Sequence, residues 1–204
     1  MNYKLSPSDF AFLWEECRRC FYLKVVRNYP RPRPIMPKIF NVIDAEMERF
    51  FSGRRTEEVI PSLPAGVVEY GEKWVQSTPI SFPGKKATCY IKGKFDTVVK
   101  FDDGSYGVID FKTSERNAEH IPLYSRQLHA YAYALENATP GELSLSPISK
   151  LGLLVYEPRV FSTSDSSSAS LEGGLVWIEV PRDNGKFLNF LERVVFILDR
   201  KSVV

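Results

Sequence analysis

The sequence predicts an α/β protein in which a central mixed β-sheet is flanked by helices. Apolar residues recur at helical spacing near both ends of the chain. Between them, residues 88–113 are rich in β-branched and aromatic residues that read as strands, and residues 122–137 again have helical spacing. A length of 204 residues, with 44% hydrophobic and 25% charged residues, suits one domain over residues 1–204.

The N-terminal quarter of the chain predicts two helices that a proline-rich connector separates. Ser8 or Asp9 can cap a helix over residues 8–26. The segment YPRPRPIMP that follows cannot continue a helix, because repeated prolines favour an extended, stiff chain. A second helix is expected next, since Gly53 lies just past a stripe of apolar residues, namely Phe40, Ile43, Met47, Phe50 and Phe51.

The middle of the chain predicts strands. Residues 67–82 read as strand or irregular segments, and residues 88–101 read as a strand pair with a bend near Gly93. The segment Asp102-Asp103-Gly104 predicts a hairpin turn, because an Asp-Gly pair between β-branched and aromatic runs is a strong hairpin signal. The strand before this turn would carry Asp96, and the strand after it would carry Asp110.

The C-terminal half alternates helices and strands. Pro122 lies near the first turn of the helix expected over residues 122–137. Two strands, residues 151–158 and 174–181, are expected to flank a low-complexity mobile loop over residues 162–170. A helix over residues 186–200 closes the chain, with apolar positions broad enough to pack against a sheet.

Two aspartates and a lysine form a candidate catalytic cluster on the predicted hairpin. Asp110 and Lys112 are two residues apart on one strand, so both side chains point to the same face. The turn folds Asp96 back beside them, and two close carboxylates are costly unless a divalent cation lies between them. A metal there could activate water and neutralise a phosphodiester. An exposed hairpin with ordinary surface charges is the alternative.

The motifs GKFDTVVKFDDGSYGVIDFKTS and SRQLHAYAYALE resemble those of the PD-(D/E)XK nuclease superfamily. Within it, the sequence is most similar to the RecB-like branch, which also contains the CRISPR-associated iron-sulfur nucleases. The N-terminal helices share the likeness, which implies a restriction-endonuclease-like core. The residues that fill the G-x-x-D, D-x-K and Q-x-x-x-Y positions are Gly93, Asp96, Asp110, Lys112, Gln127 and Tyr131.

The resemblance implies a site for Mg²⁺ or Mn²⁺. Its expected ligands are Asp96, Asp110, the backbone carbonyl of Phe111, and either Asp44 or Glu46 through water. Asp44 stands where the branch usually has a histidine, and the neighbours Glu46 and Glu48 could serve instead. Lys112 would orient the attacking water and stabilise charge on the phosphate. Gln127 and Tyr131 would contact the lysine, the water or the DNA backbone, or simply pack on the sheet.

The cysteines argue against an iron-sulfur cluster. The chain has only three, Cys17, Cys20 and Cys89, whereas the iron-sulfur relatives need four. A disulfide is not expected, and Cys17 and Cys20 are interpreted as ordinary thiols. Zinc is not expected either, because the histidines lie far from these cysteines in the sequence.

Charge alone does not predict a partner, because 27 basic residues are nearly balanced by 25 acidic ones. The distribution is more informative: basic residues that could hold DNA phosphates occur near the N-terminus and near the proposed site. They are Arg18, Arg19, Arg27, Lys94, Ser114 and Arg116, with Ser114 included as a hydrogen-bond donor. A solvated helix face explains the N-terminal cluster equally well.

The sequence therefore predicts a magnesium-dependent deoxyribonuclease, acting as an exo- or endonuclease on single- or double-stranded DNA in repair, recombination or defence. A protein partner in such a complex is possible. The alternative is an inactive nucleic-acid-binding module with the same fold. A carbohydrate or small-molecule hydrolase with paired carboxylates would leave Lys112 without a role. No apolar run approaches the roughly 18 residues of a membrane span, and no signal-peptide core is present, so a cytoplasmic protein is expected.

Overall fold

The computed structural model describes residues 1–32, 37–113, 121–163 and 167–199. Ser114 and Arg116, two of the predicted DNA contacts, lie outside these residues. The helices are α1 (Pro7–Ala11), α2 (Leu13–Glu16), α3 (Arg18–Arg27), α4 (Lys38–Phe51), α5 (Thr56–Val59), α6 (Ile121–Glu136) and α7 (Asn184–Asp199). The strands are β1 (Asn2–Leu5), β2 (Gly66–Tyr70), β3 (Lys73–Gln76), β4 (Thr88–Phe95), β5 (Thr97–Phe101), β6 (Tyr106–Thr113), β7 (Ile148–Thr163) and β8 (Ala169–Glu179).

The strands form two sheets that meet at one residue. A three-stranded sheet has the order β1-β4-β3, and a five-stranded sheet has the order β2-β5-β6-β7-β8. β6 and β7 are parallel and the other pairs of the larger sheet are antiparallel, which confirms the predicted mixed sheet. β4 ends at Phe95 in one sheet and β5 begins at Thr97 in the other, so the chain passes between the sheets at Asp96.

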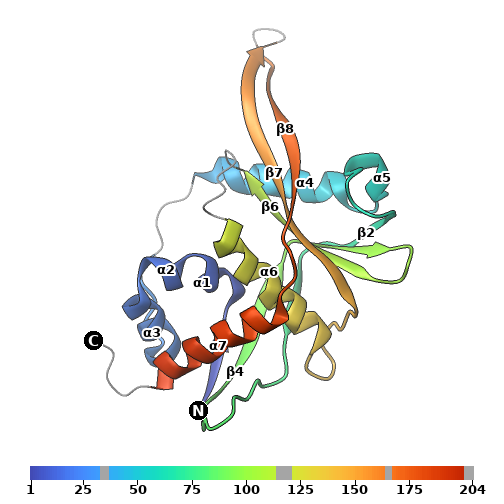
Figure 1. The fold of residues 1–204 in the computed structure, drawn as a ribbon. Coiled ribbons are helices and arrows are strands. Elements are labelled where there is room, and N and C mark those ends of the chain that lie inside the picture. Colours follow the sequence, from blue (N-terminus) through green and yellow to red (C-terminus); the bar gives the residue numbers. More distant parts are fainter. Residues whose placement is uncertain (33–36, 114–120, 164–166, 200–204) are drawn as a thin grey trace.

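Helices cover both faces of the larger sheet, as predicted (Figure 1). Because side chains alternate along a strand, successive residues of β6 point to opposite faces of this sheet. Val108 packs into a core with α6 and α7, whereas Ile109 and Phe111 pack into a second core with Met47 and Phe51 of α4. The face of β6 that carries Asp110 and Lys112 is therefore the α6 face.

The predicted first helix is wrong in its continuity, because residues 7–27 form three short helices instead of one. The chain becomes extended at Cys17, whose sulfur accepts a hydrogen bond from the backbone N–H of Cys20 and so caps α3. A disulfide joins these two cysteines, which corrects the expectation of free thiols. Cys89 remains a thiol, and its burial raises its pKa to about 12.

Two further boundaries differ from the expectation. The bend expected near Gly93 lies at Asp96, because Gly93 pairs with Val75 inside β4 and packs so close to Pro7 that a Cβ would lie 2.6 Å from its ring. The expected loop over residues 162–170 is shorter than predicted. β7 and β8 extend into it from both sides as a long hairpin that projects from the body of the protein (Figure 1).

The hairpin of β5 and β6 and the helices α4, α6 and α7 agree with the prediction to within a few residues. Gly104 has a φ of 85° in the turn after β5, a conformation that glycine adopts without strain. None of the described helices is long and apolar enough to cross a membrane.

Candidate active site

The two predicted aspartates meet where the sheets join. Thr97 pairs with Ile109 in the β5–β6 ladder, so Asp96 lies opposite Asp110 in the same register. Asp96 accepts a hydrogen bond through Oδ2 from the backbone N–H of Phe111 at 3.0 Å. Burial, followed by repulsion from the Asp110 carboxylate, raises the pKa of Asp96 well above its ordinary value. The fold thus places two acids side by side, and the negative charge of each makes ionisation of the other less favourable.

Lys112 supplies the compensating charge. Its ammonium forms an ion pair with Oδ2 of Asp110, donates to the carbonyl of Phe111 at 3.0 Å, and lies 5.1 Å from the ring centroid of Tyr124. Burial lowers the pKa of Lys112, but the carboxylates of Asp110 and Asp96 outweigh it and raise the pKa overall. A charged lysine is thereby held among two acids and an aromatic ring.

Helix α6 supports the same cluster through Gln127 and Tyr131. The amide of Gln127 donates to Oδ1 of Asp110 at 3.0 Å, and the hydroxyl of Tyr131 donates to the carbonyl of Lys94 at 2.7 Å. Because Lys94 is two residues before Asp96, Tyr131 fixes the end of β4 while Gln127 fixes β6. Burial, followed by the two aspartates, raises the pKa of Tyr131, so its hydroxyl keeps its proton and remains a donor.

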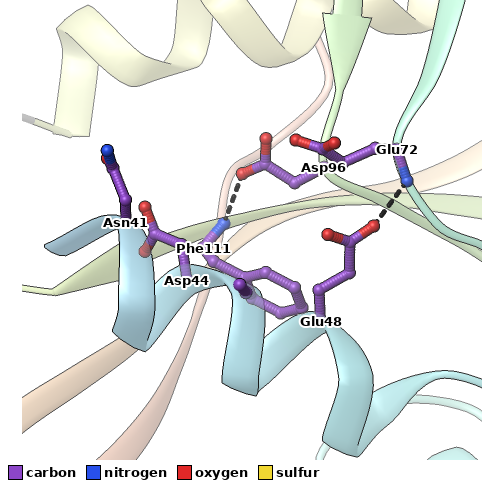
Figure 2. A pocket seen from close by; sticks show the side chains of 7 residues that line it. Asn41, Asp44, Glu48, Glu72, Asp96 and Phe111 are labelled. Atoms are coloured by element: carbon purple, nitrogen blue, oxygen red, sulfur yellow. Dashed lines mark hydrogen bonds between the residues drawn. The ribbon is translucent and has the colours of Figure 1, made fainter. Parts of the chain in front are cut away.

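Helix α4 closes the other side of the site around a cavity of about 250 Å³ (Figure 2). Asp44 and Glu48 face Asp96 across this space, and the backbone N–H of Glu72 donates to Oε1 of Glu48 at 2.7 Å. Burial raises the pKa of Asp44; the charge of Lys112 opposes this shift and that of Asp110 adds to it.

Not every predicted site residue reaches this cavity. Glu46 points away from it and forms an exposed ion pair with Arg49 one turn along α4, while Glu48 lines the cavity instead. Asp110 is only 2% exposed and is not among the residues that line the cavity. Glu72 could not be predicted as a site residue, because it lies between β2 and β3 and reaches the cavity only through tertiary folding.

The predicted DNA contacts are dispersed. Lys94 is exposed at the rim, where its ammonium forms an ion pair with Glu72. Arg18, Arg19 and Arg27 are exposed on α3 and do not line the cavity, and the guanidinium carbon of Arg18 lies 5.2 Å from the ring centroid of Trp14. The structure therefore assembles the acids and the lysine but does not bring the α3 arginines to them.

The donor set fits a hard divalent cation. Asp96 and Asp44 line the cavity with carboxylates and Phe111 lines it as well, while Asp110 lies next to Asp96 with Oδ1 bonded to Gln127 and Oδ2 paired with Lys112. Oδ2 of Asp110 is buried and makes no hydrogen bond among the described residues, although Lys112 is paired with it. No group of three acids, histidines or cysteines gathers tightly enough within the described ranges to form a metal cage. A cation here would need the carbonyl and water as further ligands.

Comparison with known proteins identifies the family of this chain. The family model described as the PD-(D/E)XK nuclease superfamily matches residues 51–176, which include Asp96, Asp110, Lys112 and the Gln127–Tyr131 helix. The chain belongs to this superfamily, whose members are usually nucleases and generally use divalent metals. No curated protein matches the chain.

Among solved structures, the chain resembles that of SSO0001 at 17% sequence identity. The likeness has a TM-score of 0.48 and covers 97% of this chain and 77% of that chain.

Proposed function

We propose that the protein is a metal-dependent deoxyribonuclease that hydrolyses phosphodiesters at the Asp96–Asp110–Lys112 cluster. One observation carries the proposal: the partly buried Asp96 lies beside the buried Asp110, and among the described residues Lys112 is the cation paired with these two acids. Such an arrangement is costly as a structural element, because each buried charge loses hydration. A divalent cation would remove the imbalance and provide the chemistry of the superfamily.

Each residue has a distinct proposed role. Asp96, Asp110 and the carbonyl of Phe111 would hold Mg²⁺ or Mn²⁺, with Asp44 or Glu48 reaching the ion through water. The ion would supply a polarised water and neutralise charge on the phosphate. Glu46, with its side chain paired to Arg49, is not retained in this set.

Hydrolysis needs a water oxygen to attack phosphorus while the bond to the leaving sugar oxygen breaks. Lys112 would stabilise the negative charge that grows on the phosphate oxygens, and its own proton would remain on Nζ because its pKa is raised. The proton lost by the water would pass to solvent, and the leaving oxygen would take a proton in return. Gln127 and Tyr131 would act by holding β6 and β4 in place.

The finer assignment is also a proposal. The G-x-x-D, D-x-K and Q-x-x-x-Y spacing supports a place in the RecB-like branch, related to the CRISPR-associated iron-sulfur nucleases but without a cluster. The disulfide between Cys17 and Cys20 and the burial of Cys89 support the absence of a cluster. A role in repair, recombination or defence, in complex with a protein partner, follows from the same likeness, whereas the proposal of a cytoplasmic location comes from the hydropathy of the sequence.

The test is cleavage of end-labelled single- and double-stranded DNA with Mg²⁺, with Mn²⁺, and with a chelator. We expect wild type to cleave only with metal and Asp110→Asn to be inactive, with divalent affinity reduced in calorimetric titration. Glu46→Gln is the matched control on α4 and should keep full activity. Folded wild-type protein that binds DNA but cleaves no substrate would instead support the binding module.

A further inference from the structure

A second cavity lies between α6 and α7, away from the acids. Its volume is about 420 Å³, and Ser125, Arg126 and His129 of α6 line it. The first cavity is lined instead by Asp44 and Glu48 of α4 with Asp96 and Phe111, so the two cavities share no lining residue.

Arg126 forms a platform at the floor of this cavity. Its guanidinium carbon lies 4.6 Å from the ring centroid of Phe190, and the guanidinium also forms an ion pair with Glu15. The side chain is still 28% exposed. Guanidinium groups held in this way can stack on nucleic-acid bases, as aromatic rings do.

Two cations flank the platform on α7. Lys186 and Arg193 line the cavity, and the rise of a helix places residues seven apart at about 10 Å along the axis on the same face. Both are exposed, and no carboxylate among the described residues lies within ion-pair distance of either. Two such cations, one on each side of a flat group, match a base flanked by backbone phosphates.

The other polar groups of the cavity are already engaged. Asp183, the acid that lines it, accepts from the backbone N–H of Lys186 at 2.8 Å and so caps α7. His129 accepts from the backbone N–H of Asp183 through Nε2 at 2.8 Å, and its Nδ1 is 2.7 Å from the carbonyl of Ser125. Burial lowers the pKa of His129, in keeping with a neutral ring. Arg126, Lys186 and Arg193 are therefore the cations that this cavity offers to a ligand.

We propose that the cavity between α6 and α7 binds one nucleotide of a single-stranded nucleic acid, with the base on Arg126 and its flanking phosphates at Lys186 and Arg193. The proposal rests on the proposed function, because it makes this cavity a subsite for the same strand. A free mononucleotide has the same chemistry and is the other source of the ligand.

The charge test measures binding in chelator, where no cleavage occurs. A fluorescein-labelled single-stranded oligonucleotide is titrated by anisotropy with wild type, Lys186→Ala/Arg193→Ala, and Lys4→Ala/Lys86→Ala, which removes the same charge at exposed positions outside the cavity lining. We expect the cavity variant to bind roughly tenfold more weakly. Its slope of log affinity against log salt should fall by about 0.7 for each lost phosphate contact. The control should match wild type in both.

The base test uses Arg126→Lys, which keeps the charge and removes the planar group. Wild type should bind the oligonucleotide more tightly than an abasic strand of equal length, and this variant should lose most of that preference. Calorimetry with deoxyadenosine monophosphate separates the two sources: binding to wild type that the cavity variant loses would identify a free nucleotide. The inference is overturned if the cavity variant and its charge-matched control bind both ligands alike. Cleavage is measured separately, so an inactive protein with cavity-dependent binding would refute the proposed function alone.

Discussion

Replacing Lys112 by methionine tests whether its ammonium offsets the free-energy cost of holding Asp96 and Asp110 side by side in the folded protein. Methionine keeps the length and apolar stem of lysine but leaves Asp110 and Asp96 without a balancing charge. Removing one partner of a buried ion pair typically costs about 3–5 kcal/mol. For a protein of this size that corresponds to a fall in Tm of roughly 6–20 °C. Typical stabilities of about 5–15 kcal/mol leave most of this range compatible with a folded variant.

Lys94→Met is the matched control. The ion pair of Lys94 with Glu72 is exposed, with 40% and 48% of the two side chains accessible. Exposed pairs contribute at most about 1 kcal/mol, so this variant should unfold close to wild type. The hydrogen bond from Tyr131 is kept in the control, because it is made to the backbone carbonyl of Lys94.

Urea and thermal unfolding are measured in chelator and again with saturating Mn²⁺. A cation bound to the acids would replace the missing charge, so Mn²⁺ should raise the Tm of Lys112→Met more than that of wild type. The variant should nevertheless stay about 10²–10³ slower in cleavage, as expected when one well-placed charged group is lost from the transition state. If Lys112→Met unfolds within 1 kcal/mol of wild type in chelator, the charge-balance reasoning is refuted. Equal Mn²⁺ shifts in the two proteins would show that the cation does not replace the charge of Lys112, and no shift in either protein would refute the metal site.

Three other measurements test neighbouring parts of the site. Asp44→Asn should weaken Mn²⁺ binding several-fold in calorimetry, whereas the same titration of Glu46→Gln should reproduce wild type. Tyr131→Phe removes the hydrogen bond to the Lys94 carbonyl and should lower the free energy of unfolding by about 1 kcal/mol, with a change below experimental error counting against a positioning role. Without metal, the raised pKa of Asp96 means that the folded state holds a proton that the unfolded state releases above pH about 4, so this group destabilises the protein as pH rises from there toward its folded pKa. The free energy of unfolding of wild type and of Asp96→Asn is measured against pH, and the difference between the two curves should show that slope. Parallel curves would contradict the raised pKa of Asp96.

The parts of the site that could be predicted from sequence are those set by local rules. The Asp-Gly turn fixed the hairpin register, and alternation along β6 put Asp110 and Lys112 on one face. Helical spacing likewise put Gln127 and Tyr131 on one face of α6, where each makes a hydrogen bond near the acids. In each case residues close in sequence determine the geometry.

The rest depended on tertiary packing. Which acid of α4 faces the cavity depends on how Met47 and Phe51 seat the helix, and a stripe of apolar residues does not resolve Glu46 from Glu48. The bend is not at Gly93 because this residue pairs with Val75 inside β4, where it lies close to Pro7, and β4 continues to Phe95. A glycine in a strand was expected to mark a bend, but here the lack of a side chain on Gly93 lets Pro7 pack close to the backbone of β4.

The junction at Asp96 explains why the acids are held so firmly together. Asp96 is the single residue between β4 and β5, so its backbone is fixed by one sheet on each side, and its carboxylate is fixed by the N–H of Phe111. Asp110 is fixed in turn by β6 and by Gln127. Neither acid can move away from the other without breaking a strand pairing or a buried hydrogen bond. The backbone therefore cannot relax their repulsion, which without metal is reduced by Lys112 and by the proton that the raised pKa of Asp96 retains, and a divalent cation would take the place of that proton.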